Sequence, residues 1–143
     1  MTNNSHFVDN QDGTVTDTQS GLTWSREDSW QKEGKWVTWD EAFEFSRHLV
    51  DLELGGHIDW RLPTPDEALT LYVPEAANKD KYGKTIHLDP VFPEGPQACI
   101  WTHEVAKGNE GVVLNFHTGK LEPKFKSVSG RLAARPVHGI LKK

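Results

Sequence analysis

The sequence predicts an α+β fold in one domain, with two helices packed on an antiparallel sheet that joins the two ends of the chain. Strand-like runs lie at both ends, and two capped helical segments lie between them. A long irregular stretch separates the second helix from the later strands. The length of 143 residues suits one domain with a core of its own.

The first predicted element is a β-hairpin. Residues 7–9 (FVD) and 14–16 (TVT) flank a turn that ends at Gly13, a residue able to adopt a positive φ. A second turn over 18–21 leads into a further strand-like run at 22–24. The N-terminal part is therefore expected to be a small meander.

A capping box begins the first predicted helix. Thr38 can accept a hydrogen bond at the helix start, and Glu41 can bond back to it. Apolar residues then recur at helical spacing, which predicts a helix over about 39–52. The glycine pair 55–56 lies just beyond, where left-handed backbone favours glycine. Residues 25–37 show no such periodicity and are predicted to be irregular.

A second capping box, formed by Thr64 and Glu67, begins the next helix, with a proline at the first helical position. This helix is expected to run to about Tyr72. The residues just before it, 58–62, predict a short strand.

Residues 74–97 are expected to form a long loop with local turns, because they hold four of the eight prolines and little periodicity. A structureless stretch of this length is usually functional or disordered, which makes the loop a candidate recognition surface. Strand-like runs follow at 98–102, 112–116 and 131–137.

Five ordered segments carry a resemblance to a known family. They are FVDNQDGTVTDTQSGLTW at 7–24, WDEAFEF at 39–45, GGHIDWRLPTPDE at 55–67, IWTHE at 100–104 and RLAARPV at 131–137. Together they resemble the Lcl C-terminal domain family, a group of bacterial domains of unclear function.

The resemblance covers residues 6–138, which leaves 1–5 and 139–143 as short tails. It implies a C-type-lectin-like fold that presents a long loop region as a binding face. It also implies a protein or glycan ligand, because the family's founding domain is implicated in binding sulfated glycosaminoglycans and in trimer formation. A homo-oligomer is therefore an expected partner state. The resemblance implies no catalytic residues.

The charge distribution limits the classes of partner. The net charge of −5 argues against a general nucleic-acid binder. Residues 120–143 nevertheless hold seven basic groups and one acidic group. This basic segment, which includes Lys124 and Lys126, is either a solvated face or a patch for an acidic glycan or a neighbouring subunit.

No run of apolar residues is long enough to predict a membrane span. The first residues also lack the pattern of a signal peptide. The chain as written is expected in the cytoplasm, or as an exported or periplasmic protein if a leader has been removed.

The cluster Asp59-Trp60-Arg61 is interpreted as structural. An arginine at a crowded strand-to-helix joint can satisfy a carboxylate and several carbonyls with its five donors. Trp60 would pack beneath the helices. An acid–base pair would need a group that titrates near working pH, which arginine is not.

Other residues are candidates for ligand contacts. The aromatic side chains of Trp30, Trp36 and Tyr82 lie in polar segments, where they could contact a sugar or a protein, or cover a satellite core. His87 and His103 lie in the long loop and the turn 103–110.

A metal site is an alternative for the same region. The histidine spacings do not match a structural zinc site, but His87, Asp89, His103 and Glu104 could converge, with His117, into a two-histidine, one-carboxylate site. Calcium is a further candidate, through four acidic side chains: Asp80, Asp89, Glu94 and Glu104. The single cysteine, Cys99, lies in an apolar run and is expected to be an inert core thiol.

The sequence therefore favours a non-catalytic binding module over an enzyme. It would hold a protein partner or an anionic glycan through the loop 74–97, the turn 103–110 and the basic C-terminal segment. One alternative is a metal-dependent enzyme that uses the loop histidines. Another is a subunit that docks into a larger assembly.

Overall fold

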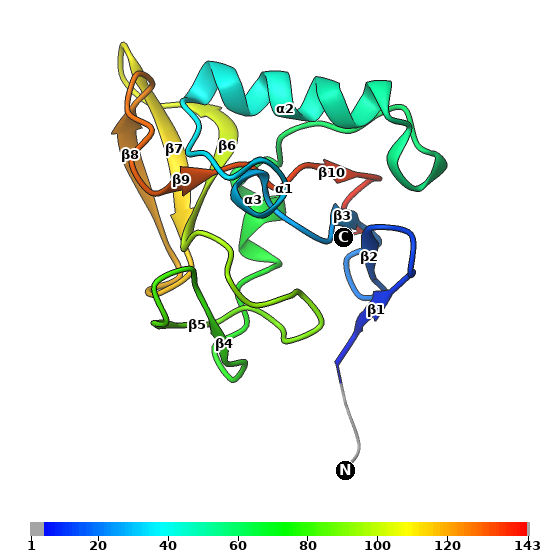
Figure 1. Cartoon of the computed structure of the whole chain (residues 1–143). Coiled ribbons are helices and arrows are strands. Elements are labelled where there is room, and N and C mark those ends of the chain that lie inside the picture. The colour runs from blue at the N-terminus through cyan, green and yellow to red at the C-terminus, as the bar shows by residue number, and fades with distance from the viewer. Residues whose placement is uncertain (1–4, 143) are drawn as a thin grey trace.

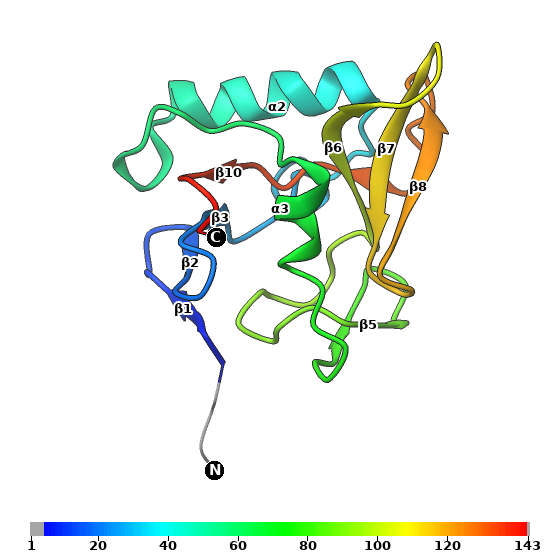
Figure 2. The same cartoon turned by 180° about the vertical axis from the view of Figure 1, so that it is seen from behind.

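The computed structural model describes residues 5–142. Two four-stranded sheets lie side by side, and one long helix runs along both of them (Figures 1 and 2). A shorter helix, α3 (Pro65–Leu69), lies between the sheets. The domain is thus a mixed α/β fold with mainly antiparallel strands, in agreement with the predicted class.

The first sheet joins the two ends of the chain. Its order is β1 (Phe7–Asp9), β2 (Thr14–Asp17), β3 (Thr23–Ser25) and β10 (Val137–His138). All of its pairs are antiparallel, and Trp24 pairs with Val15 on one side and Val137 on the other. The expected hairpin, meander and shared sheet are all present.

The second sheet has the order β8 (Lys120–Phe125), β7 (Glu110–Asn115), β6 (Cys99–Val105) and β9 (Leu132–Ala133). β9 pairs with β6 in parallel, so the expectation of a purely antiparallel sheet was wrong here. The run 131–137 also splits, with β9 in one sheet and β10 in the other. The short run from β9 to β10 therefore passes directly from the second sheet to the first.

Strand β8 was not predicted, because Pro123 lies within it. Proline cannot donate a ladder hydrogen bond and is confined to edge strands. β8 is such an edge, and Pro123 pairs with Val112 of β7.

The long helix α2 (Trp39–Asp51) and α3 both begin with the predicted capping boxes, although α3 ends earlier than expected. A third helix, α1 (Ser29–Glu33), lies in the segment predicted to be irregular, so the expectation of two helices was wrong. The glycine pair 55–56 belongs to a 3-10 turn, η1 (Leu54–Gly56), just after α2. The strand predicted over 58–62 is absent from the described chain except for one bridge between Arg61 and Val137.

The region 74–97 is more ordered than predicted. It contains the short hairpin β4 (Asn78–Lys79) and β5 (Thr85–Ile86). Ile86, Leu88 and Phe92 are fully buried in the core cluster that also contains Trp24. Residues 74–97 therefore contribute to the hydrophobic core as well as to the surface.

A second core cluster lies under α2 and contains Trp60 and Trp101. The Trp101 indole donates to the carbonyl of Val37 at 2.9 Å, which fixes the segment before α2 on the second sheet. Across residues 5–142, no helix combines the length and the apolar character that a membrane crossing requires.

Candidate functional site

Arg61 forms a closed polar joint between α3 and the last residues of the chain. Its guanidinium donates to both carboxylate oxygens of Glu67, at 2.7 and 2.9 Å, and to the carbonyl of Gly139 at 2.7 Å. Burial raises the pKa of Glu67, but the hydrogen bonds from Arg61 and from the Thr64 backbone outweigh it, so the net pKa lies below the ordinary value. Arg61 thus holds the start of α3 in place.

The two neighbours of Arg61 differ from each other. Trp60 is 4% exposed and donates from its indole to the carbonyl of Leu54, as a framework residue would. The Asp59 side chain is 64% exposed and faces His138. Asp59 therefore departs from the structural role expected for all three residues.

Of the three aromatic residues expected at a ligand surface, Trp36 and Tyr82 are exposed and Trp30 is half-buried. Trp30 and Trp36 stack on each other at 6.4 Å, and Lys81 lies over Trp30. The guanidinium of Arg131 lies 4.4 Å from the ring centre of Tyr82.

The two lysines singled out in the basic segment both lie on or beside the edge strand β8. Lys126 lies over the ring of Trp39 at 3.9 Å, and Lys124 forms a long ion pair with Glu122.

The predicted metal ligands do not converge. His87 faces the carbonyl of Ala76, and Asp89 accepts hydrogen bonds from Ser5 and the Val91 backbone. His103 and Glu104 are exposed at the far end of β6. Within residues 5–142, the only set of histidine, cysteine and acidic ligand atoms close enough to share an ion lies elsewhere.

The acidic residues considered for calcium also stay apart. Asp80 and Asp89 are buried, and each uses one oxygen to accept backbone N–H groups. Glu94 and Glu104 are exposed on other segments.

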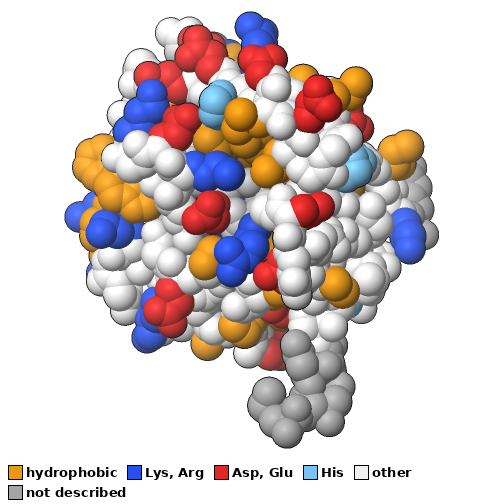
Figure 3. Space-filling view, turned by 45° about the vertical axis from the view of Figure 1, so that its right-hand side comes forward, with side chains coloured by type: hydrophobic (Ala, Val, Ile, Leu, Met, Phe, Trp, Pro, Cys, Tyr) orange, Lys and Arg blue, Asp and Glu red, His pale blue; other side chains and the backbone are white. Residues whose placement is uncertain are grey.

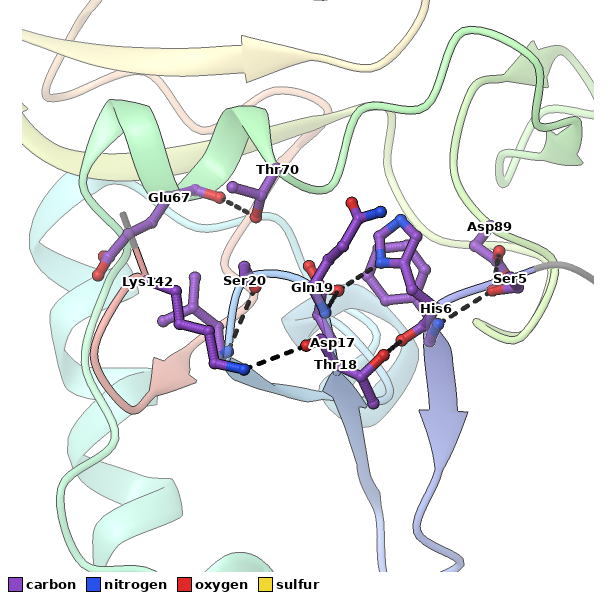
Figure 4. A network of polar contacts seen from close by, with 12 residues as sticks. Ser5, His6, Asp17, Thr18, Gln19, Ser20, Glu67, Thr70, Asp89 and Lys142 are labelled. Atoms are coloured by element: carbon purple, nitrogen blue, oxygen red, sulfur yellow. Dashed lines mark hydrogen bonds and ion pairs between the residues drawn. The ribbon is translucent and has the colours of Figure 1, made fainter.

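The larger hollow of the molecule is a groove of about 1020 Å³ beside α3. Figure 4 shows the polar network along it. Buried Asp17 accepts hydrogen bonds from His6 and from the Gln19 backbone, whereas its second oxygen has no partner within residues 5–142. Lys142 donates to the carbonyl of Thr18 at 3.4 Å. Two carboxylates of the groove, those of Asp17 and Asp89, are thus paired with the N-terminal residues His6 and Ser5.

The smaller hollow is a pocket of about 270 Å³ lined by the β4–β5 hairpin, the start of β6 and Arg131. Gln97 lies in its wall and is 1% exposed, yet neither its amide oxygen nor its amide nitrogen has a hydrogen-bond partner within residues 5–142. The Gln97 backbone N–H donates to Asp28 at 2.8 Å. The backbone is thus fixed, and the side-chain amide is free.

Asp80 and His117 form an ion pair at the same pocket. The His117 Nε2 lies 3.2 Å from one Asp80 oxygen, and the other oxygen accepts from the backbones of Tyr82 and Lys84. The His117 Nδ1 donates to the carbonyl of Thr85 at 3.0 Å. Both ring nitrogens face acceptors, so His117 cannot take a proton from a nucleophile in this arrangement.

Cys99 also lines the pocket, which brings a cysteine, a histidine and an aspartate together. Burial, aided by the charge of Glu122, raises the pKa of the Cys99 thiol to about 11. A nucleophilic cysteine needs a lowered pKa. The trio therefore lacks the properties of a catalytic triad.

The rim of the pocket is positively charged. Arg131 and Lys84 are both exposed there, and Arg131 forms no ion pair with any residue in 5–142. Arg131 adopts a left-handed backbone with φ of 62°, a conformation that L residues with side chains rarely adopt. Such strain is often found at functional sites.

Beneath the pocket, Asp28 and Arg135 are both buried. Asp28 caps α1 through the backbone of Gln31. Arg135 donates to the carbonyls of Ser25 and Arg26, at 2.9 and 2.6 Å. Burial raises the pKa of Asp28 and lowers that of Arg135 to about 10, and the attraction between the two charges opposes both shifts.

The sequence did not point to Gln97, Asp28 or Arg135. A capping-box pattern from Asp28 to Gln31 was the one local signal, and it would have located α1. Gln97 has no local signal, because its missing partners depend on segments distant in sequence.

A family model for the Lcl C-terminal domain matches residues 13–138 of the chain. A comparison with curated proteins finds no match. The family match spans every element from β2 to β10 and confirms the resemblance seen in the sequence. The chain belongs to the Lcl C-terminal domain family.

Proposed function

We propose that the protein is a non-catalytic binding domain whose site is the pocket around Gln97, and that its ligand is a small anion rich in hydroxyl groups, such as an acidic sugar residue. The domain would then be a variant of the C-type-lectin-like fold. The sheet that joins its ends and the long segment 74–97 support that relationship.

The free amide of Gln97 carries the proposal. A buried polar group without a partner costs about 1–3 kcal/mol, so nearly all such groups are paired in native proteins. Both ends of this amide are buried and unpaired within residues 5–142, and Gln97 is one of the residues that line the pocket. An amide offers two donors and one acceptor oxygen, which complement a hydroxyl group that both donates and accepts.

The rim and the size of the pocket define the ligand further. Arg131 and Lys84 supply positive charge at the opening, which favours a ligand with a carboxylate or sulfate group. The volume of about 270 Å³ is below the roughly 300–1,000 Å³ of sites for drug-sized ligands. One sugar ring is a ligand of suitable size.

Calorimetric titration with glucuronate tests the proposal, with glucose as the uncharged counterpart. We expect glucuronate to bind more tightly than glucose, and Gln97→Leu to weaken binding at least about tenfold. Gln19→Leu is the matched control, because Gln19 lines the larger groove. Equal loss in both variants, or binding that neither variant changes, would contradict the assignment.

A protein partner is a second candidate, supported by a separate observation. Phe125 at the end of the edge strand β8 is 60% exposed, and Val128 just after it and Val105 at the end of β6 are also exposed. The face in Figure 3 mixes charges of both signs and shows hydrophobic side chains in small groups. A docked protein would be detected by pull-down and lost in Phe125→Ser.

A further inference from the structure

His57, Asp59 and His138 come together although they are far apart in the sequence. His57 and Asp59 follow η1, and His138 lies on β10. Two backbone hydrogen bonds between Arg61 and Val137, at 3.0 and 2.8 Å, hold the two segments side by side. The juxtaposition is therefore fixed by the backbone and does not depend on the three side chains.

The three side chains face one another, and the two imidazole rings pack against the buried Trp60. The rings of His57 and His138 stack with their centres 3.7 Å apart. The Nδ1 of His138 lies 3.0 Å from one Asp59 oxygen. Trp60, which is buried, meets both imidazole rings edge-on. One ligand atom from each of the three residues lies within 4.8 Å of the others.

We propose that His57, Asp59 and His138 form a binding site for a transition-metal ion, with zinc as the representative. Two imidazoles and one carboxylate suit zinc and its neighbours in the first transition series, whereas calcium and magnesium prefer oxygen ligands. The partial exposure of all three residues leaves room for water or another ligand on the ion.

The surrounding charges suit a cation. The side chain of Asp59 is mostly exposed and offers a carboxylate oxygen beside the His138 ring. The nearest arginine, Arg61, already donates to both oxygens of Glu67, which offsets its positive charge. Metal-bound histidine is neutral, so the ion removes the repulsion that two stacked imidazolium rings would have.

The simpler interpretation is a surface ion pair between Asp59 and His138. Such a pair makes the same contact without an ion and contributes about 0–1 kcal/mol. His57 separates the two interpretations, because an ion pair needs only His138, whereas His57 brings a second imidazole nitrogen within 4.8 Å of the other two ligand atoms.

Calorimetric titration of the full chain, without an affinity tag, with zinc chloride tests the proposal. We expect one zinc ion per chain, and His57→Ala, His138→Ala and Asp59→Asn each to weaken its binding at least about tenfold. The matched control is His103→Ala, an exposed histidine on β6 that should leave binding unchanged. Thermal unfolding of each variant without metal checks that the fold is kept.

A second readout is cobalt absorption in the visible range, whose bands strengthen when the ion passes from octahedral water ligands to a site of lower coordination number in the protein. These bands should appear in the wild type and in His103→Ala, and disappear in His57→Ala. Binding should also weaken as pH falls through the range in which histidine takes up protons, about 6.5. Zinc binding that survives His57→Ala, or no binding by the wild type, would overturn the site.

Discussion

The Arg61 joint and the Gln97 pocket are both polar systems within the fold, and they differ in how completely they are paired. In the joint, the guanidinium of Arg61 meets both oxygens of Glu67 and a carbonyl. In the pocket, neither end of the Gln97 amide has a hydrogen-bond partner within residues 5–142. The comparison teaches that Arg61 is paired by the fold itself, whereas the Gln97 amide is buried beside a pocket with both its donor and its acceptor ends unpaired.

The largest expected effect on the free energy of unfolding is at Arg135, which is buried with Asp28 beneath the pocket. Arg135→Ala should lower the free energy of unfolding by about 3–5 kcal/mol, because Asp28 would remain buried without its compensating charge. Urea unfolding measures the change. The double variant Asp28→Asn with Arg135→Met should recover much of the loss. If Arg135→Ala is as stable as the wild type, the Asp28–Arg135 pair does not stabilise the fold beneath the pocket.

The Arg61 joint should show a smaller effect, because the Arg61 side chain is 40% exposed. Arg61→Ala should cost about 1–3 kcal/mol in urea unfolding, since the 7%-exposed carboxylate of Glu67 would lose its partner. Arg61→Lys should recover only part, because an ammonium cannot donate in the same fork. Full recovery of stability in Arg61→Lys would show that the positive charge alone, without the forked hydrogen bonds, accounts for the stabilisation.

The stability difference between wild type and Arg61→Ala should depend on pH. The pKa of Glu67 is lowered in the fold, so the stabilisation is present above its ordinary value of 4.5 and is lost as pH falls through the lowered value. The free energies of unfolding of the wild type and Arg61→Ala should therefore converge as pH falls below 4.5 and through the lowered pKa of Glu67. A difference that persists there would assign the effect of Arg61 to its bond with Gly139.

The smallest effect on stability is expected in the pocket. Gln97→Leu should leave the free energy of unfolding unchanged or raise it by up to about 1–2 kcal/mol, because it removes an unpaired amide. Chemical unfolding of this variant beside Arg61→Ala tests the contrast. A loss comparable to that of Arg61→Ala would mean that Gln97 belongs to the frame.

The parts of the fold that were predicted from the sequence depend on local chemistry. The capping boxes at Thr38 and Thr64 placed α2 and α3, and Gly13 marked the first hairpin. The burial of Leu88 and Phe92 could not be read locally, because it depends on strands that lie elsewhere in the chain.

The candidate sites were even less visible in the sequence. Tyr82, which was predicted as an exposed contact residue, is exposed and lines the pocket, with the Arg131 guanidinium over its ring. Gln97 is an uncharged residue in a proline-containing stretch, and only packing leaves its amide unpaired. His138 meets Asp59 across 79 residues of sequence, a spacing that no local motif describes.

The central claim is that the Gln97 amide faces a ligand, and its own NMR signals test this most directly. The side-chain NH₂ pair of Gln97, assigned by its absence in Gln97→Leu, would be followed during titration of the full chain with glucuronate. We predict a saturable shift of this pair, with the Gln19 pair unchanged. Saturable binding that leaves the Gln97 pair in place would contradict the account.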